Sequence, residues 1–353
     1  MSIPSKVIQK KNIEGFLRGL AKDHAVFVPE ENKGTVSLGR LSRDLFLPAR
    51  YTNFIVPPSK SFLFPESIKK YVEYPFDDKW MEPGKKVLFG VRPCDAHSFV
   101  LLDKAVKDNL FYKEKREDAL LIVMGCNSPA GTCFCTSVNG GPFSTMGADI
   151  FMADIGDRFV VEDISGRAAG CLSYLMDADG QDLVEKEKAA SDSMKKMTGG
   201  VNCISLPEKL ESADRKFSKD GTWEKLGRHC TNCARCTSVC PTCHCCFVIE
   251  DIVEIVCDEM GDKAKDFDPC MLNIAVSGGL DGRVPLGYQR VQRRLMDKFC
   301  RSMKTVGQPF CVGCGRCIEA CVENVDITEL LKFVITAEAQ CSGDIFSGQA
   351  LQI

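Results

Sequence analysis

The chain has 353 residues, of which 44% are hydrophobic and 26% charged, values that are ordinary for a globular protein with room for two domains. Its formal net charge of −3 argues against a nucleic-acid-binding protein. The first twenty residues lack a signal-peptide pattern, and no apolar run reaches the roughly 18 residues of a membrane span. We therefore expect a cytoplasmic protein that does not enter a membrane. Cytoplasmic thiols are kept reduced, so the 21 cysteines predict metal ligation rather than disulfides.

The N-terminal part of the chain has the alternating pattern of an α/β or α+β domain. Short runs rich in Val, Ile and Leu predict strands at 86–93, 119–126, 149–156 and 157–165, and apolar spacing predicts a helix at 99–110. We expect this domain to cover residues 1–180. Residues 181–224 are highly charged, and we interpret them as a helical connection to the rest of the chain.

Four cysteines of this domain stand at positions that suggest a metal site. Cys94 and Cys126 each stand at the end of a predicted strand, at the edge where α/β folds gather functional groups, and Cys133 and Cys135 share one short loop. Four converging thiolates can hold a [4Fe–4S] cluster, with Asp95 as a substitute ligand if one of the four falls short. The alternative is that these cysteines are small buried hydrophobic residues. We favour the metal site, because a Cys-Phe-Cys loop is a poor way to fill a core.

Two cysteine runs in the C-terminal part have the spacing C-x2-C-x2-C-x3-C, which is typical of bacterial ferredoxins that bind [4Fe–4S] clusters. In such paired runs the fourth cysteine ligates the other cluster. The spacing therefore predicts two clusters with crossed ligands: Cys230, Cys233, Cys236 and Cys321 for one, and Cys311, Cys314, Cys317 and Cys240 for the other. Zinc is the weaker alternative, since it takes two knuckles separated by a longer loop.

The segments around the two runs have helical periodicity. Apolar residues recur three or four apart in FVIEDIVEIVCDEM, YQRVQRRLMDKFCRSMK and ITELLKFVITAEAQ. We therefore expect an α-helical ferredoxin module over residues 225–353. In the second of these segments one apolar stripe faces the core: Val291, Leu295, Phe299 and Met303. We interpret its basic residues as a solvated face rather than a partner-docking surface.

Five segments carry a narrower pattern than the paired runs alone: PPSKSFLFPESI, VLFGVRPCDAHSFVLLD, GTCFCTSVNGGP, CTNCARCTSVCPTCHC and CVGCGRCIEAC. In these segments the chain resembles the iron–sulfur subunit that anaerobic sulfite reductase shares with the cytoplasmic sulfhydrogenases, where it is the beta subunit, and similar subunits of flavin oxidoreductases linked to heterodisulfide reductase. The resemblance implies an electron-carrying subunit. Its implied partners are a flavoprotein that oxidises NAD(P)H and a catalytic subunit of hydrogenase, sulfite reductase or heterodisulfide reductase type.

Other readings of the chain remain open at this level. Nucleotide-binding motifs of the G-x-G-x-x-G or G-x-x-x-x-G-K-[ST] kind are missing from the sequence, so we expect no flavin or nucleotide on this chain. An enzyme subunit whose N-terminal cluster binds a small sulfur substrate is the alternative function, and a structural metal protein is a third hypothesis. Cys243 and Cys245 lie outside the ferredoxin positions, and we interpret them as thiols near a cluster that are not ligands.

Overall fold

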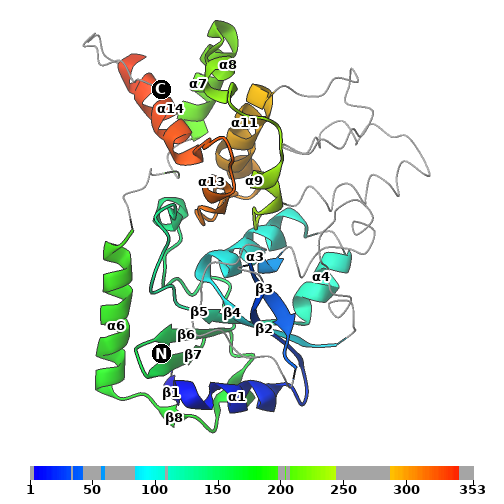
Figure 1. Cartoon of the computed structure of the whole chain (residues 1–353), viewed down its shortest axis with the longest axis vertical. Coiled ribbons are helices and arrows are strands. Elements are labelled where there is room, and N and C mark those ends of the chain that lie inside the picture. Colours follow the sequence, from blue (N-terminus) through cyan, green and yellow to red (C-terminus); the bar gives the residue numbers. More distant parts are fainter. Residues whose placement is uncertain are drawn as a thin grey trace, which may run out of the picture.

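The structure is a computed structural model that describes residues 4–32, 35–42, 57–59, 84–107, 110–197, 203, 207–243 and 287–341. A mixed sheet with its covering helices forms the N-terminal part, and a group of helices lies beside it (Figure 1). Within the described residues, we find no helix that is long and apolar enough to cross a membrane.

The secondary structure elements are as follows. The strands are β1 (Ser5–Gln9), β2 (Ala25–Asn32), β3 (Thr35–Arg40), β4 (Lys86–Val91), β5 (Ala119–Met124), β6 (Ile150–Asp154), β7 (Arg158–Asp163) and β8 (Met176–Asp177). The helices of the sheet region are α1 (Ile13–Leu20), α3 (Pro93–Ala105), α4 (Leu110–Glu117), α5 (Ala169–Leu172) and α6 (Gly180–Lys195). Those of the second region are α7 (Pro207–Asp220), α8 (Thr222–Gly227), α9 (Arg235–Ser238), α11 (Gly287–Met296), α12 (Ser302–Thr305), α13 (Arg316–Glu319) and α14 (Ile327–Cys341).

The sheet has the strand order β3-β2-β4-β5-β6-β7-β1-β8 in the described part of the chain. Its centre is parallel, since β2, β4, β5 and β6 pair in the same direction, whereas the strands on both flanks are antiparallel. Every residue of β4 and β5 is buried, as expected for parallel strands covered on both faces. The mixed α/β character predicted for the N-terminal part is thus confirmed, and the four predicted strands correspond to β4, β5, β6 and β7.

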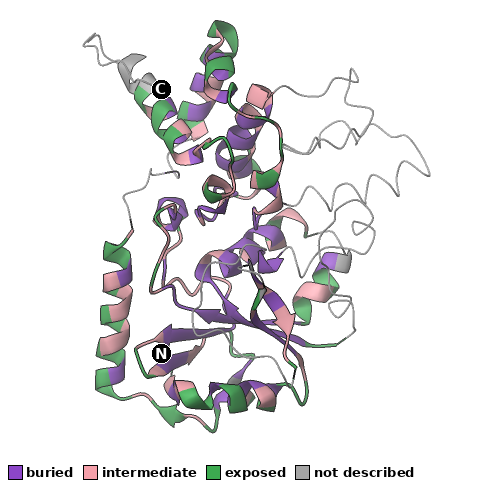
Figure 2. Ribbon diagram, in the orientation of Figure 1, coloured by how far each residue is buried: buried purple, intermediate pink, exposed green. Residues whose placement is uncertain are grey.

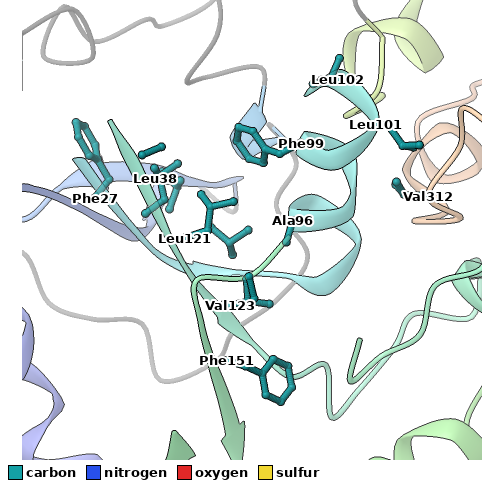
Figure 3. Packing of buried hydrophobic residues seen from close by; sticks show 14 of the residues in the cluster. Phe27, Leu38, Ala96, Phe99, Leu101, Leu102, Leu121, Val123, Phe151 and Val312 are labelled. Atoms are coloured by element: carbon teal, nitrogen blue, oxygen red, sulfur yellow. The ribbon is translucent and has the colours of Figure 1, made fainter. Parts of the chain in front are cut away.

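Successive side chains of the central strands point to opposite faces of the sheet and pack into two separate hydrophobic cores. Leu121 and Val123 of β5 pack on the face covered by α3, together with Phe99 (Figure 3). Ile122 and Met124 point to the opposite face, which α1 covers. Because the strands run parallel, β4 and β5 both end at the same edge of the sheet, and the chain continues from there into α3 and into the loop that carries Cys126.

The second region has its own core, built from the apolar faces of its helices (Figure 2): Leu210, Phe217, Trp223, Val291, Leu295, Phe299, Leu331 and Val334. Phe134 and Val138 of the N-terminal part pack into this core. The predicted helix at the C-terminus is α14, and the predicted helix around 288–304 is α11 and α12 joined by a π-helical segment, η6 (Asp297–Arg301). The helix predicted from FVIEDIVEIVCDEM lies outside the described residues.

Candidate metal centres

The first predicted ligand set surrounds one cavity. All four of its members, which we call the first set, line this cavity: Cys230, Cys233, Cys236 and Cys321. Cys321 thus reaches the first cysteine run from the second one. Apolar side chains of α11 and α14 form much of the remaining wall: Val291, Leu295, Ile327 and Leu330. Cys233 is exposed, so this cavity lies at the surface of the molecule.

The second predicted ligand set lies deeper. Its members, the second set, are Cys240, Cys311, Cys314 and Cys317. The pKa of the Cys314 thiol is raised to about 11, chiefly by burial and in part by the charges of Cys317 and Cys240 nearby. The pKa of Cys311 is raised for the same reasons, with Cys317 and Cys240 again among its neighbours. Cys240, from the first run, therefore lies among the first three cysteines of the second run.

Lys298 connects the two runs at the second set. Its buried Nζ donates hydrogen bonds to Thr242 Oγ1 at 2.9 Å and to the Phe310 carbonyl at 3.0 Å. Thr242 Oγ1 also donates to the Phe310 carbonyl at 2.9 Å and lies 3.4 Å from Cys240 Sγ. Phe310 directly precedes Cys311. One buried ammonium therefore holds the end of the first run against the start of the second.

The basic residues of this helix do not form the solvated face that their charge suggests. Arg290, Arg294 and Lys298 recur every four residues and are only 1%, 7% and 5% exposed. Burial raises the pKa of Cys240, but the charges of Lys298 and Arg294 outweigh it, and the pKa falls to about 6. The interpretation as a solvated face is therefore wrong for these three residues, and two of them, Arg294 and Lys298, lie beside the thiols instead.

The cysteines of the N-terminal part also lie together, and we call them the third set: Cys94, Cys126, Cys133 and Cys135. Burial is the main reason that the pKa of Cys133 is raised to about 11 and that of Cys135 to about 12, and the charge of Cys126 contributes to both. The pKa of Cys94 is also raised by burial, with Asp95, Cys314 and Cys126 adding to the effect. All three thiols are thus neighbours of Cys126.

The third set lies against the second run. Cys133 Sγ is 3.7 Å from the Cys314 carbonyl, and the Phe134 amide donates to the Gly313 carbonyl at 2.8 Å. Beside this contact, Arg316 Nη1 and Nη2 donate to the two carboxylate oxygens of Asp95 at 2.7 and 2.9 Å. Both carboxylate oxygens of Asp95 thus accept a hydrogen bond from Arg316, and its role as a substitute ligand stays a prediction.

Several buried polar atoms near the third set lack a hydrogen-bond partner among the described residues: Arg92 Nε, Ser137 Oγ, His97 Nδ1 and His97 Nε2. Each belongs to a residue within three positions of Cys94 or Cys135. Burial, with a contribution from Lys104, lowers the pKa of His97 to about 4, so its ring is neutral at neutral pH.

The two cysteine runs share one backbone conformation. The second and fourth residues after the first cysteine have positive φ in both runs: 61° at Asn232 and 58° at Ala234, and 62° at Gly313 and 73° at Gly315. A short helix follows each time, α9 in the first run and α13 in the second. Both runs therefore form the same loop around their cysteines.

The donor chemistry of these sets fits iron–sulfur clusters. Each set offers four cysteine sulfurs, the usual ligands of a [4Fe–4S] cluster, and the buried cations offset the negative charge of thiolates. A zinc site needs its ligands about 2.3 Å from a single ion. In the part of the chain that the structure describes, no three His, Cys, Asp or Glu side chains converge closely enough to hold one ion.

The remaining candidates are less central. Cys243 is buried near Cys240, and its charge partly opposes the lowering of the Cys240 pKa. Cys245 lies outside the described residues. His229 is exposed and accepts a hydrogen bond from Arg228 Nε at 2.9 Å. Sequence reasoning did not find Lys298, Arg316 or His97, although the four-residue spacing of the buried cations on one helix was a visible signal.

Comparison with known proteins agrees with this geometry. Residues 229–325 match the family of 4Fe-4S dicluster domains. The chain is 28% identical to sulfhydrogenase 2 subunit beta of Pyrococcus furiosus over 329 residues, which are 90% of this chain and 94% of that protein. No solved structure matches the chain. The chain therefore contains a region of 4Fe-4S dicluster type and is similar over most of its length to a sulfhydrogenase beta subunit, as the resemblance of its motifs predicted.

Proposed function

We propose that this chain is the iron–sulfur subunit of an oxidoreductase complex, and that it relays electrons through three [4Fe–4S] clusters. The first, second and third sets hold one cluster each. The helices from about residue 225 onward form the ferredoxin module around the first two clusters, and the domain of residues 1–180 carries the third. A bound cluster of this type accepts and gives up one electron at a time.

The contiguity of the three sets carries this proposal. Cys317 lines the cavity of the first set and is also a neighbour of Cys240 in the second. Cys314, another member of the second set, contacts Cys133 of the third. The three sets thus form one continuous row from the exposed Cys233 to the edge of the sheet. A structural metal protein has no use for such a row, whereas an electron relay requires it.

The protein supplies the surroundings of this row. Lys298 and Arg294 stabilise negative charge at the second set, and apolar side chains of α11 and α14 line part of the first. Arg316 lies between Cys314 and Cys317 in the chain and is a charged neighbour of Cys94 and Cys314. Its guanidinium therefore lies beside cysteines of both the second and the third set.

The two ends of the row suggest two partners. The relative is by name a sulfhydrogenase subunit, so we propose a hydrogenase-type catalytic partner at one end. At the other end we propose a flavoprotein that oxidises NADH or NADPH. The chain itself has no nucleotide-binding motif, so it depends on this partner for pyridine-nucleotide electrons.

Analysis of iron, acid-labile sulfide and reducibility tests the proposal on the full chain purified without oxygen. We expect about twelve irons, as three cubes require, and bleaching of the visible absorption by dithionite but not by NADH or NADPH. Addition of the flavoprotein that copurifies with the chain should enable bleaching by pyridine nucleotide. Direct bleaching by NADPH without any other protein contradicts the relay.

Substitution of two cysteines tests the third cluster separately. The double variant Cys133→Ser/Cys135→Ser should lose about four irons and keep two reducible clusters. The matched control is Cys171→Ser/Cys203→Ser, which changes two cysteines outside the three sets and should keep the full iron content. Equal iron content in both variants contradicts a third cluster and leaves a relay of two.

A further inference from the structure

His97 is a buried residue of α3 whose imidazole makes no hydrogen bond within the described part of the chain. It is 2% exposed, and neither ring nitrogen has a hydrogen-bond partner among the described residues. Buried polar groups in folded proteins are nearly always hydrogen-bonded. A buried imidazole with two unused nitrogens therefore indicates a partner other than these protein groups.

The ring of His97 lies beside the third set. A Cβ atom placed on Gly140 would be 3.5 Å from Cys135 Cβ and 3.6 Å from His97 Nδ1, so these two side chains border the same small space. His97 also follows Cys94 by three residues, a spacing that puts both on one face of α3. The ring is thus flanked by two cysteines of the third set that come from different segments.

The same face of α3 is directed at the second run. Leu101, one turn after His97, points toward Val312 (Figure 3), and Cys94 is an electrostatic neighbour of Cys314. The loop of Cys133 and Cys135 also contacts the second run, through Phe134 and Gly313. His97 therefore stands on the side of the third set that faces the second set.

We propose that His97 donates a hydrogen bond from a ring nitrogen to a sulfur atom of the metal centre held by the third set, and that this bond raises the reduction potential of that centre. The inference rests on the third cluster of the proposed function. Four cysteines already complete the ligands of a cube, so His97 acts as a hydrogen-bond donor and not as a ligand. A hydrogen bond to sulfur stabilises the more negative, reduced form.

His97→Phe and His97→Gln in the full chain test this role. Reduction adds one electron to the centre, taken from dithionite in a mediated titration, and no bond of the protein forms or breaks. At a fixed solution potential, His97→Phe should lower the ratio of reduced to oxidised third centre about tenfold, which equals about 59 mV for one electron. His97→Gln keeps an N–H donor and should recover part of the loss. Iron content should stay at the wild-type value in both variants.

The third centre is followed by the electron paramagnetic resonance signal that Cys133→Ser/Cys135→Ser removes. The matched control is His24→Gln, because His24 follows α1 by four residues, far from the cysteine sets in sequence, and its Nδ1 lies 3.3 Å from the Leu20 carbonyl. It should leave the potential unchanged. An unchanged potential in His97→Phe overturns the inference but does not contradict the third cluster. Loss of about four irons in His97→Phe also overturns the inference, because His97 would then be a ligand of the cluster. If wild-type protein lacks the third signal, the third cluster of the proposed function fails, and the inference fails with it.

Discussion

Asp95 and Arg316 are 221 residues apart in the chain and form a buried two-point ion pair, with their side chains 0% and 4% exposed. Asp95 directly follows Cys94 of the third set, and Arg316 directly precedes Cys317 of the second. The pair therefore joins the N-terminal part to the second cysteine run at the place where two candidate metal centres meet.

Removal of one charge from this pair should destabilise the protein strongly. Asp95→Asn leaves the Arg316 guanidinium buried without its full counter-charge, which costs about 3–5 kcal/mol of unfolding free energy for such pairs. The double variant Asp95→Leu/Arg316→Met removes both charges and should be less destabilised than Asp95→Asn. Anaerobic guanidinium unfolding followed by far-ultraviolet circular dichroism measures both effects.

An exposed ion pair provides the control. Lys332 and Glu329 are 2.7 Å apart on α14, and both side chains are largely exposed. Glu329→Gln should leave the unfolding midpoint nearly unchanged, because exposed pairs contribute little. Equal midpoints for Asp95→Asn and Glu329→Gln contradict a structural role of the buried pair.

Cys321→Ser should damage the centre of the first run, although Cys321 belongs to the second. The reason is its position in the cavity lined by Cys230, Cys233 and Cys236. Cys240→Ser should damage the centre of the second run, although Cys240 belongs to the first run. Electron paramagnetic resonance of the reduced full chain separates the signals, with Cys300→Ser as a control cysteine outside the sets. Loss of the same signal in Cys321→Ser and in Cys311→Ser contradicts the crossed arrangement.

Lys298→Met should weaken the second set in two measurable ways. Loss of the hydrogen bonds to Thr242 and to the Phe310 carbonyl costs about 1.5–3 kcal/mol, as is usual for bonds from a charged donor. Loss of a buried positive charge should also shift the reduction potential of the second-set centre to more negative values. A mediated potentiometric titration measures this shift.

Lys304→Met is the matched control for this variant. Lys304 follows Lys298 by six residues, is exposed, and pairs with Glu211 at 2.5 Å. Its removal should leave the potential of the second-set centre unchanged. If both variants shift the potential equally, the effect comes from net charge and not from the buried position of Lys298.

The sequence predicted the elements that depend on local pattern. Buried parallel strands such as β5 read as continuous apolar runs. The spacing of the two cysteine runs predicts two ligand sets, and the members of the first line one cavity. The first strands were not predicted, because β2 (Ala25–Asn32) combines an apolar start with a proline and three polar residues. The buried cations were assigned to solvent, since a charge is buried only when its partner is near, and such partners are distant in sequence.

Two glycines of the second run, Gly313 and Gly315, are explained by contacts with a loop that is distant in the sequence. A Cβ on Gly313 would lie 2.5 Å from the main-chain carbonyl of Phe134, and a Cβ on Gly315 would lie 2.5 Å from that of Thr132. The first run has the same positive φ values but carries Asn232 and Ala234 at the equivalent positions. Backbone conformation alone therefore does not require both glycines. The loop of the third set, which packs on the second run, does.

Gly315→Ala should consequently separate the second run from this loop. The new methyl group cannot be accommodated without a shift of the Thr132 main chain, and the hydrogen bond from Thr132 Oγ1 to Glu319 Oε1, 2.7 Å long, should be lost with it. The reverse change in the first run, Ala234→Gly, meets the same φ requirement and relieves the strain of a non-glycine residue there, about 1 kcal/mol. Limited proteolysis of the 130–140 loop measures the separation: Gly315→Ala should speed cleavage and Ala234→Gly should not. Equal cleavage rates in the two variants would mean that the close approach of these loops does not hold the N-terminal part on the second run.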